Sequence, residues 1–188
     1  TNTPLGTVGS GTTVASGATL DLNGYTLGTA EALTLNGTGV GGTAGALANS
    51  SGTAVTYSGL LTLGSDATVN ATGSITLSNA GTITGSGSTL TLAGTATGSS
   101  MASIVGTGAG GLTKTGTGTW TLSGASTYTG ATTVSAGTLK LGAAGGTTNT
   151  PLGTVGSGTT VASGATLDLN GYTLGTAEAL TLNGTGVG

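Results

Sequence analysis

The sequence predicts an all-β fold, a right-handed parallel β-helix, and three observations lead to this prediction. Apolar and polar residues alternate in short clusters, most clusters end in a glycine-containing turn, and the first 41 residues return unchanged from Thr148. Alternation with a period of two places apolar side chains on one face of a strand, and turns this close together leave no room for helices. A chain that repeats without a linker favours an open stack of coils over a closed Greek-key β-sandwich, which is the alternative.

The identical segments, residues 1–41 and 148–188, define the expected domain organisation. Thr1 and Thr148 are 147 positions apart, so we expect residues 1–147 to form one full solenoid unit and residues 148–188 to begin the next identical unit. An identity of this length exceeds what a shared composition gives. Each unit of such an array buries its apolar surface against its neighbours, and we expect the chain to be a window on a longer array.

Eight strong clusters are predicted to be strands. In each cluster two large apolar residues flank a polar one, as expected for a strand with one buried face. Threonine and valine, which are frequent here, also favour strands. The clusters are residues 20–22, 33–35, 55–57, 61–63, 75–77, 90–92, 120–122 and 139–141.

Nine weaker clusters are predicted to be further strands between the strong ones. With three strands to a coil, the 147-residue unit would hold six coils or seven, and the sequence leaves both open. Coils stack at about 4.8 Å, so a unit would rise by roughly 29 to 34 Å. The weaker clusters are centred on Val8, Val14, Leu27, Leu47, Val69, Ile83, Ile104, Leu112 and Val134.

The composition excludes several classes of function. The chain has no His, no Cys, two basic residues and a net charge of −3, so we expect no nucleic-acid partner. No apolar run approaches the roughly 20 residues that span a bilayer, so we expect no integral membrane segment. Because catalysis needs convergent nucleophiles, acids or bases, we predict that the chain is not an enzyme and has no catalytic, cofactor-binding or metal-binding residues.

The few charged side chains are expected at solvated outer positions, and the tryptophan in the core. Asp21 lies between Leu20 and Leu22, whereas Trp120 alternates with Leu122. Four asparagines in Asn-x-Ser/Thr triplets are read as turn residues: Asn36, Asn49, Asn70 and Asn183. The charged residues are Asp21, Glu31, Asp66, Lys114, Lys140, Asp168 and Glu178.

Residues 110–142, GGLTKTGTGTWTLSGASTYTGATTVSAGTLKLG, resemble the autotransporter-associated β-strand repeat of the passenger regions of bacterial type V secreted proteins. The order of the two halves, GGLTKTGTGTWTLSG and STYTGATTVSAGTLKLG, is specific, and Trp120 and Tyr128 stand where that family often carries a large residue. The resemblance implies a surface-exposed or secreted β-helical passenger, often adhesive, and implies no catalytic residues.

The expected function is mechanical. We expect an extracellular structural β-solenoid at the bacterial cell surface, forming a filament, stalk or adhesin shaft in which copies join head to tail along the axis. The alternative is an adhesin passenger whose outer face binds polysaccharide, such as cell-surface glycans, or another cell. An ice-binding solenoid is disfavoured because the threonine runs at residues 82–84, 89–91 and 113–121 do not recur at a fixed period.

Overall fold

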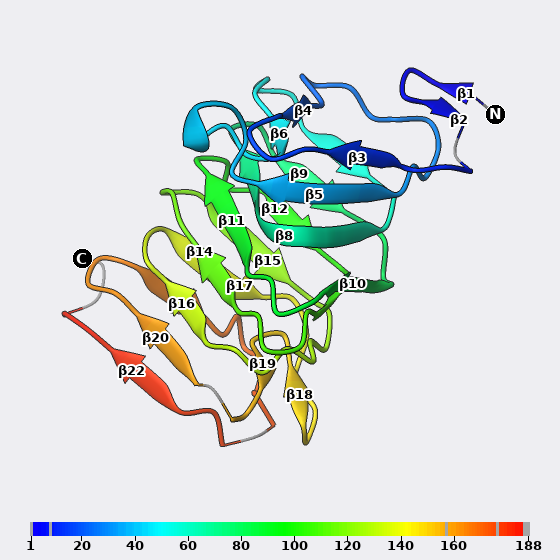
Figure 1. Ribbon diagram of the computed structural model, residues 1–188. Coiled ribbons are helices and arrows are strands. Elements are labelled where there is room, and N and C mark those ends of the chain that lie inside the picture. The colour runs from blue at the N-terminus through cyan, green and yellow to red at the C-terminus, as the bar shows by residue number, and fades with distance from the viewer. Residues whose placement is uncertain (1, 8, 157, 176, 186–188) are drawn as a thin grey trace.

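The computed structural model describes residues 2–7, 9–156, 158–175 and 177–185, and they form a parallel β-helix. The chain winds in successive coils, and corresponding strands of neighbouring coils lie side by side in parallel (Figure 1). Because strands of successive coils pair in parallel, the β-sandwich alternative is wrong. The strands stack in three columns, here called A, B and C.

Column A and column B belong to one sheet and are joined by a long strand that bends from one column into the other. This strand, β8 (Leu61–Ala71), pairs with β5 through Leu61–Leu63 and with β6 through Val69–Ala71. Column A contains β3 (Thr12–Val14), β5 (Leu33–Gly37), the first part of β8, β10 (Thr82–Gly85) and β13 (Ile104–Gly106). Column B contains β4 (Leu20–Asp21), β6 (Leu47–Asn49), the second part of β8, β11 (Leu90–Gly94), β14 (Leu112–Lys114), β16 (Thr132–Val134), β20 (Thr159–Val161) and β22 (Leu180–Leu182).

Column C is a separate six-stranded sheet. It contains β7 (Val55–Tyr57), β9 (Ile75–Leu77), β12 (Ser99–Met101), β15 (Thr119–Leu122), β17 (Thr138–Leu141) and β21 (Thr166–Asp168). Two antiparallel hairpins and one short 3-10 turn complete the described elements. They are β1 (Asn2–Thr3) with β2 (Gly6–Thr7), β18 (Asn149–Thr150) with β19 (Gly153–Thr154), and η1 (Val40–Gly42).

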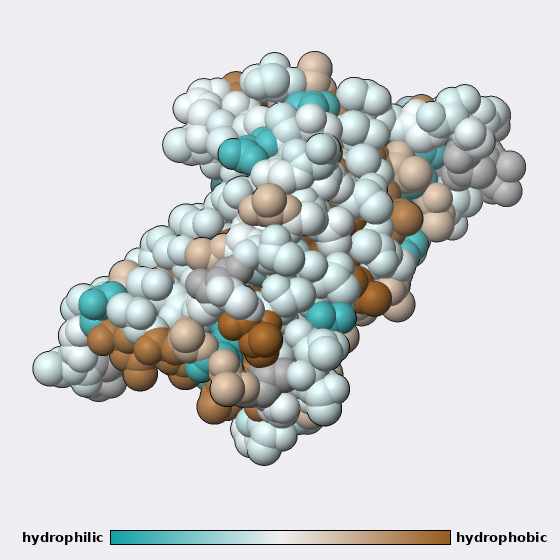
Figure 2. Space-filling model, turned by 60° about the horizontal axis from the view of Figure 1, so that its bottom comes forward, coloured by the Kyte–Doolittle hydropathy of each residue, from teal (hydrophilic) through white to brown (hydrophobic). Residues whose placement is uncertain are grey.

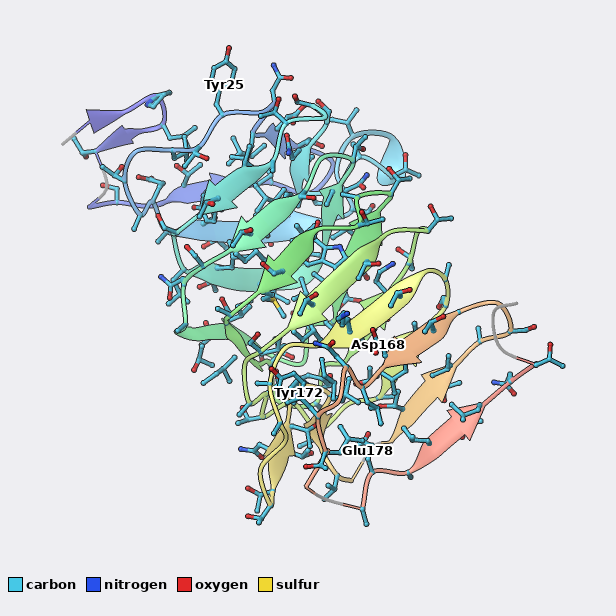
Figure 3. All side chains as sticks on the ribbon, turned by 180° about the vertical axis from the view of Figure 1, so that it is seen from behind. Tyr25, Asp168, Tyr172 and Glu178 are labelled. Atoms are coloured by element: carbon cyan, nitrogen blue, oxygen red, sulfur yellow. The ribbon has the colours of Figure 1, made fainter. Side chains whose placement is uncertain are left out.

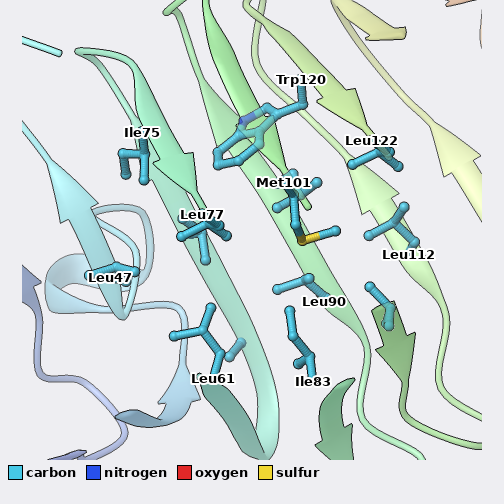
Figure 4. Packing of buried hydrophobic residues seen from close by; sticks show 14 of the residues in the cluster. Leu47, Leu61, Ile75, Leu77, Ile83, Leu90, Met101, Leu112, Trp120 and Leu122 are labelled. Atoms are coloured by element: carbon cyan, nitrogen blue, oxygen red, sulfur yellow. The ribbon is translucent and has the colours of Figure 1, made fainter. Parts of the chain in front are cut away.

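The core is a continuous column of apolar side chains inside the coils (Figure 4). Leu90 and Leu92 are buried while Thr91 between them is half-buried, so the predicted inner and outer faces are confirmed. Trp120 also lies inside, and its indole N–H donates to the carbonyl of Ala93 at 3.0 Å. Inward residues of neighbouring coils pair directly, as Leu90 does with Leu112, which extends the apolar contact along the axis.

The predicted strands are confirmed with few exceptions. All eight strong clusters contain strand residues, and so do the weaker clusters at Val14, Leu47, Val69, Ile83, Ile104, Leu112 and Val134. Leu27 lies in a loop, so a strand there was wrongly predicted, and Val8 lies outside the described residues. At Ile104 the inward side chain is that of the next residue, Val105.

Coil length varies because loops of different size leave the columns. Leu112 pairs with Thr132, 20 positions further on, whereas Leu33 pairs with Leu61, 28 positions further on. The longer coil includes the Val40–Gly42 turn. Regular strand stacking and irregular sequence spacing therefore coexist in the same molecule.

Glycines allow the coils to approach closely at the corner between columns B and C. Gly94 has φ +109°, and a Cβ there would lie 2.1 Å from the carbonyl oxygen of Ala71 in the coil before. In the same way, a Cβ on Gly116 would lie 2.4 Å from the Gly94 oxygen, and one on Gly137 would lie 2.4 Å from the Gly116 oxygen. A side chain in this row would push neighbouring coils apart.

Candidate functional site

Chemically reactive side chains do not converge at any point in the part of the chain that the structure describes. Among these residues no group of three or more His, Cys, Asp or Glu is placed to hold a metal ion. Within the same residues, no helix has the length and apolar character needed to cross a membrane. The features that stand out are two buried charges, a row of threonines, the junction between the two copies and an open apolar end.

Lys114 is fully buried, so its predicted position on the solvated outside is wrong. Within β14 it alternates in phase with Leu112, and it pairs with Leu92 and Val134 of the adjoining coils. Its ammonium donates to three backbone carbonyls at the column B–C corner, those of Thr115 at 2.6 Å, Gly116 at 2.8 Å and Ala136 at 3.1 Å. Burial lowers the pKa of Lys114 to about 8.

Glu31 is also fully buried, and its predicted outer position is also wrong. Its Oε1 accepts a hydrogen bond from the Thr12 hydroxyl at 3.0 Å, and the Tyr57 hydroxyl donates to its backbone carbonyl. Its Oε2 has no hydrogen-bond partner among the described residues. Thus the carboxylate is bound by the coil before it, while Tyr57 of the coil after it binds the backbone carbonyl of the same residue.

Glu178, the copy of Glu31, shows how this environment is built. Its Oε1 accepts from the Thr159 hydroxyl at 2.9 Å, which reproduces the contact between Glu31 and Thr12. Glu178 is only half-buried, because no coil of the described chain covers it. Burial nevertheless raises its pKa.

The remaining charges lie on the outside, as predicted. Asp21 is exposed and accepts hydrogen bonds from the backbone N–H groups of Asn23 at 2.9 Å and Ser50 at 3.0 Å. Lys140 forms an ion pair with Asp168 at 3.2 Å, and this pair joins the first copy to the second across their boundary. Both partners are partly solvated, so the pair contributes little to stability.

The asparagines of the Asn-x-Ser/Thr triplets connect neighbouring coils. The Asn36 side chain donates to the carbonyl of Val14 at 2.9 Å, and its copy Asn183 donates to the carbonyl of Val161 at 3.2 Å. Asn49, which is fully buried, accepts from the backbone N–H of Gly24 at 2.9 Å and donates to the carbonyl of Ser74 at 3.3 Å. Asn36, Asn49 and Asn70 lie within β5, β6 and β8, so the prediction that they are turn residues is wrong, whereas Asn183 follows the end of β22.

An outward row of threonines runs along column B and a shorter one along column A, although the threonine runs showed no fixed spacing in the sequence. The variable loops absorb the differences in spacing, so directly paired positions of successive strands all carry threonine. The position two residues further along β8 and β11 carries Asn70 and Ala93, so each of these two strands adds one threonine to the row. In column A, Thr13, Thr34, Thr62 and Thr84 pair in the same way. The column B row consists of Thr68, which is buried, and of Thr91, Thr113, Thr133, Thr160 and Thr181, which are half-buried or exposed.

Residues 148–188, here called the second copy, contact residues 1–147, here called the first copy, directly and without a linker. Pro4 is exposed and Leu5 half-buried in the first hairpin, whereas their copies Pro151 and Leu152 are buried, Leu152 to 2% exposure. The difference arises because the coil that holds Tyr128 lies beneath the second hairpin.

Hydrogen bonds fix the second hairpin on this coil. The Thr132 hydroxyl donates to the carbonyl of Leu152 at 2.8 Å and lies 2.6 Å from the Tyr128 hydroxyl. The backbone N–H of Thr154 donates to the carbonyl of Tyr128 at 3.0 Å. A Cβ on Gly153 would lie 2.7 Å from the Tyr128 ring, so glycine permits this close contact.

The end of the solenoid that carries β22 is open and apolar. Leu180 and Leu182 are 41% and 67% exposed, and they line a cavity of about 540 Å³ with Val161 and Leu167. Their copies Leu33 and Leu35 are 1% and 0% exposed, because β8 covers them. Figure 2 shows apolar surface gathered at this end, and Figure 3 places Tyr172 and Glu178 near it, far from Tyr25 at the other end.

Comparison with known proteins gave one match. A search of curated proteins and a search of solved structures found nothing similar to the chain. A family model matches residues 112–141, which run from β14 to the end of β17 and include Lys114, Trp120 and Tyr128. The matched family is the passenger-associated-transport-repeat family, and it corresponds to the autotransporter repeat that the sequence of this segment resembles.

Proposed function

We propose that the chain is a structural segment of a secreted bacterial passenger protein, a β-solenoid shaft on the cell surface or outside the cell. The observation that carries this proposal is the junction, where the second copy continues the stack of the first without a linker. The passenger-associated-transport-repeat match supports secretion and surface display. On this proposal the chain has no catalytic role.

The stack has the properties that a shaft needs. Backbone hydrogen bonds between coils run along the axis, so extension of the shaft would work against many of them together. Asparagine side chains add contacts between coils, as at Asn36 with Val14 and Asn49 with Gly24 and Ser74. The surface is hydrated by threonine and serine and carries few charges, which limits its attraction to other molecules.

Copies of the unit are the proposed partners, joined head to tail. A chain that ended after residue 147 would expose the Tyr128 and Thr132 surface that Leu152 covers here. The hairpin of another copy has the same sequence as residues 148–154 and would fit there. We expect this contact to bring single units into filaments.

Sedimentation of residues 1–147 tests this proposal, with Leu5→Asp as the matched variant. Leu5 is half-buried in the first copy, whereas its counterpart Leu152 is 2% exposed at the junction. The charge would therefore block association more than folding. We expect filaments from the unchanged unit and monomers from the folded variant. A monomeric unchanged unit at high concentration would contradict head-to-tail joining.

A second candidate is an adhesin face that binds polysaccharide, and the threonine row favours it. The row offers uncharged hydroxyl groups at a regular spacing of about 4.8 Å. We do not propose ice binding, because the threonine rows of columns A and B run together in two coils alone of the described chain, those of β8 and of β10 with β11, and so do not form an extended two-dimensional array. A glycan array separates shaft from adhesin: a passive shaft gives only background, whereas an adhesin gives a signal that Thr113→Asp with Thr133→Asp removes.

A further inference from the structure

The two copies of the repeated segment occupy different columns of the same solenoid. β3 stacks in column A beneath β5, whereas its copy β20 stacks in column B on β16. β4 pairs with β6 in column B, whereas its copy β21 pairs with β17 in column C. In the second copy, both strands thus lie one column further on, in the same direction, than in the first copy.

The strand pairing within each copy is the same, although the two copies occupy different columns. Thr12 pairs with Leu33 in the first copy, and Thr159 pairs with Leu180 in the second, in both cases 21 positions further on. The hydrogen bond from Thr12 to Glu31 recurs between Thr159 and Glu178. The described strands of the second copy, β20 to β22, are therefore rotated about the axis together relative to β3 to β5, and the pairing within the copy is unchanged.

The hairpin β18–β19 at the junction explains why the second copy is rotated by one column. If the second copy occupied the same columns as the first, Thr159–Val161 would lie in column A, above residues 126–128. That place is taken by β18 and β19, since Ser126 pairs with Thr150 and Thr154 donates to Tyr128. The strand that follows the hairpin consequently reaches column B.

We infer that the 147 positions between the copies correspond to six full coils and one further column, so that consecutive units are related by about one third of a turn. After β3, the chain returns to column A at β5, β8, β10, β13, residues 126–128 and the hairpin β18–β19, and then reaches β20. This inference rests on the proposed tandem shaft. It replaces both predicted coil counts, six and seven.

The rotation of one third of a turn between consecutive units determines which directions the surface loops of a shaft face. With six and one-third coils of about 4.8 Å, each unit rises by about 30 Å. A surface loop such as η1 then faces three directions in succession and returns to the same side after three units, about 90 Å further on. A partner that binds one such loop can approach the shaft from any side.

Disulfide trapping in the 188-residue chain tests the inference, because the chain has no Cys. Thr133 and Thr160 pair directly and point outward in column B, so their Cα atoms lie about 4.8 Å apart, within reach of a disulfide. Thr127 lies on the outside of column A, next to Gly106. It would be the neighbour of Thr160 if the copies were in phase.

Three double variants are compared under mild oxidation, with loss of free thiols as the readout. Thr91→Cys with Thr113→Cys is the positive control, because both lie in column B of the first copy and pair directly. We expect near-complete loss of free thiols in this control and in Thr133→Cys with Thr160→Cys. We expect retention of both thiols in Thr127→Cys with Thr160→Cys.

The other outcomes separate the two proposals. Cross-linking of Thr127→Cys with Thr160→Cys alone would overturn the third of a turn and leave the continuous shaft intact. Cross-linking of both test pairs would overturn a fixed rotation between units. Failure of both pairs, with a positive control that cross-links, would show that the second copy does not stack on the first, and would contradict the shaft as well.

Discussion

The charge on Lys114 makes a specific prediction about stability and pH. Burial lowers the pKa of this side chain from 10.5 to about 8 in the folded protein. Between these pH values the unfolded chain binds the proton and the folded chain does not, so the free energy of unfolding should rise as the pH rises. A difference of about 2.5 pKa units corresponds to about 3 kcal/mol.

The rise should stop near pH 10. Burial raises the pKa of both Tyr57 and Tyr128, so above about pH 10 the unfolded chain loses these protons first and stability falls again. The expected profile is therefore flat below about pH 8, rising to about pH 10, and falling beyond it. Below pH 8 the ammonium is present in both states, held in the folded protein by the three carbonyls.

Urea unfolding followed by the fluorescence of Trp120, the single tryptophan, measures this profile between pH 7 and 11. Lys114→Met is the control, because it keeps the apolar stem and removes the titrating group. Other groups, including the α-amino group, titrate equally in both proteins, so the difference between the two profiles isolates Lys114. Equal slopes in both proteins between pH 8 and 10, or falling stability in the unchanged chain alone, would refute the reasoning.

Three further predictions concern the core, the corner glycines and metal ions. Leu90→Asp should destabilise the coils by roughly 4 kcal/mol or more, since it removes a buried leucine and buries a carboxylate, whereas Thr91→Asp should be mild; equal protease resistance would show that the faces are wrongly assigned. Gly94→Ala should cost several times the roughly 1 kcal/mol expected for Gly108→Ala, because both have positive φ but only Gly94 faces a neighbouring carbonyl; equal melting temperatures would contradict the close approach. EDTA should leave the melting temperature unchanged, because the acidic residues are too scattered to supply the roughly 6 to 8 oxygens that calcium takes, and a fall of many degrees would disprove this.

Much of the fold follows from the alternation of apolar and polar residues. Leu90 and Leu92 point inward and Thr91 outward because a strand has a period of two. The two buried charges obey the same rule: Lys114 is two residues from Leu112, and Glu31 is two residues from Leu33. The prediction for these two residues was wrong because it gave more weight to their charge than to their position in the alternation. Hydrogen bonds inside the solenoid satisfy the ammonium fully and the carboxylate in part.

The number of coils and the threonine row could not be read from the sequence. Both depend on how far each loop leaves the columns, and apolar periodicity says nothing about that distance. The hairpin at residues 149–154 has no strong alternation, yet it fills a place in column A and turns the next copy by one column. The junction also depends on Tyr128, whose contact with Leu152 spans 24 positions of the sequence through Thr132.

Fibre diffraction from an aligned tandem array of 147-residue units tests the continuous parallel solenoid most directly. Stacked coils place the strand spacing of about 4.8 Å along the fibre axis, together with an axial rise of about 30 Å for each unit. The account predicts both spacings on the meridian. A 4.8 Å reflection on the equator, or a meridian without the 4.8 Å reflection, would contradict it.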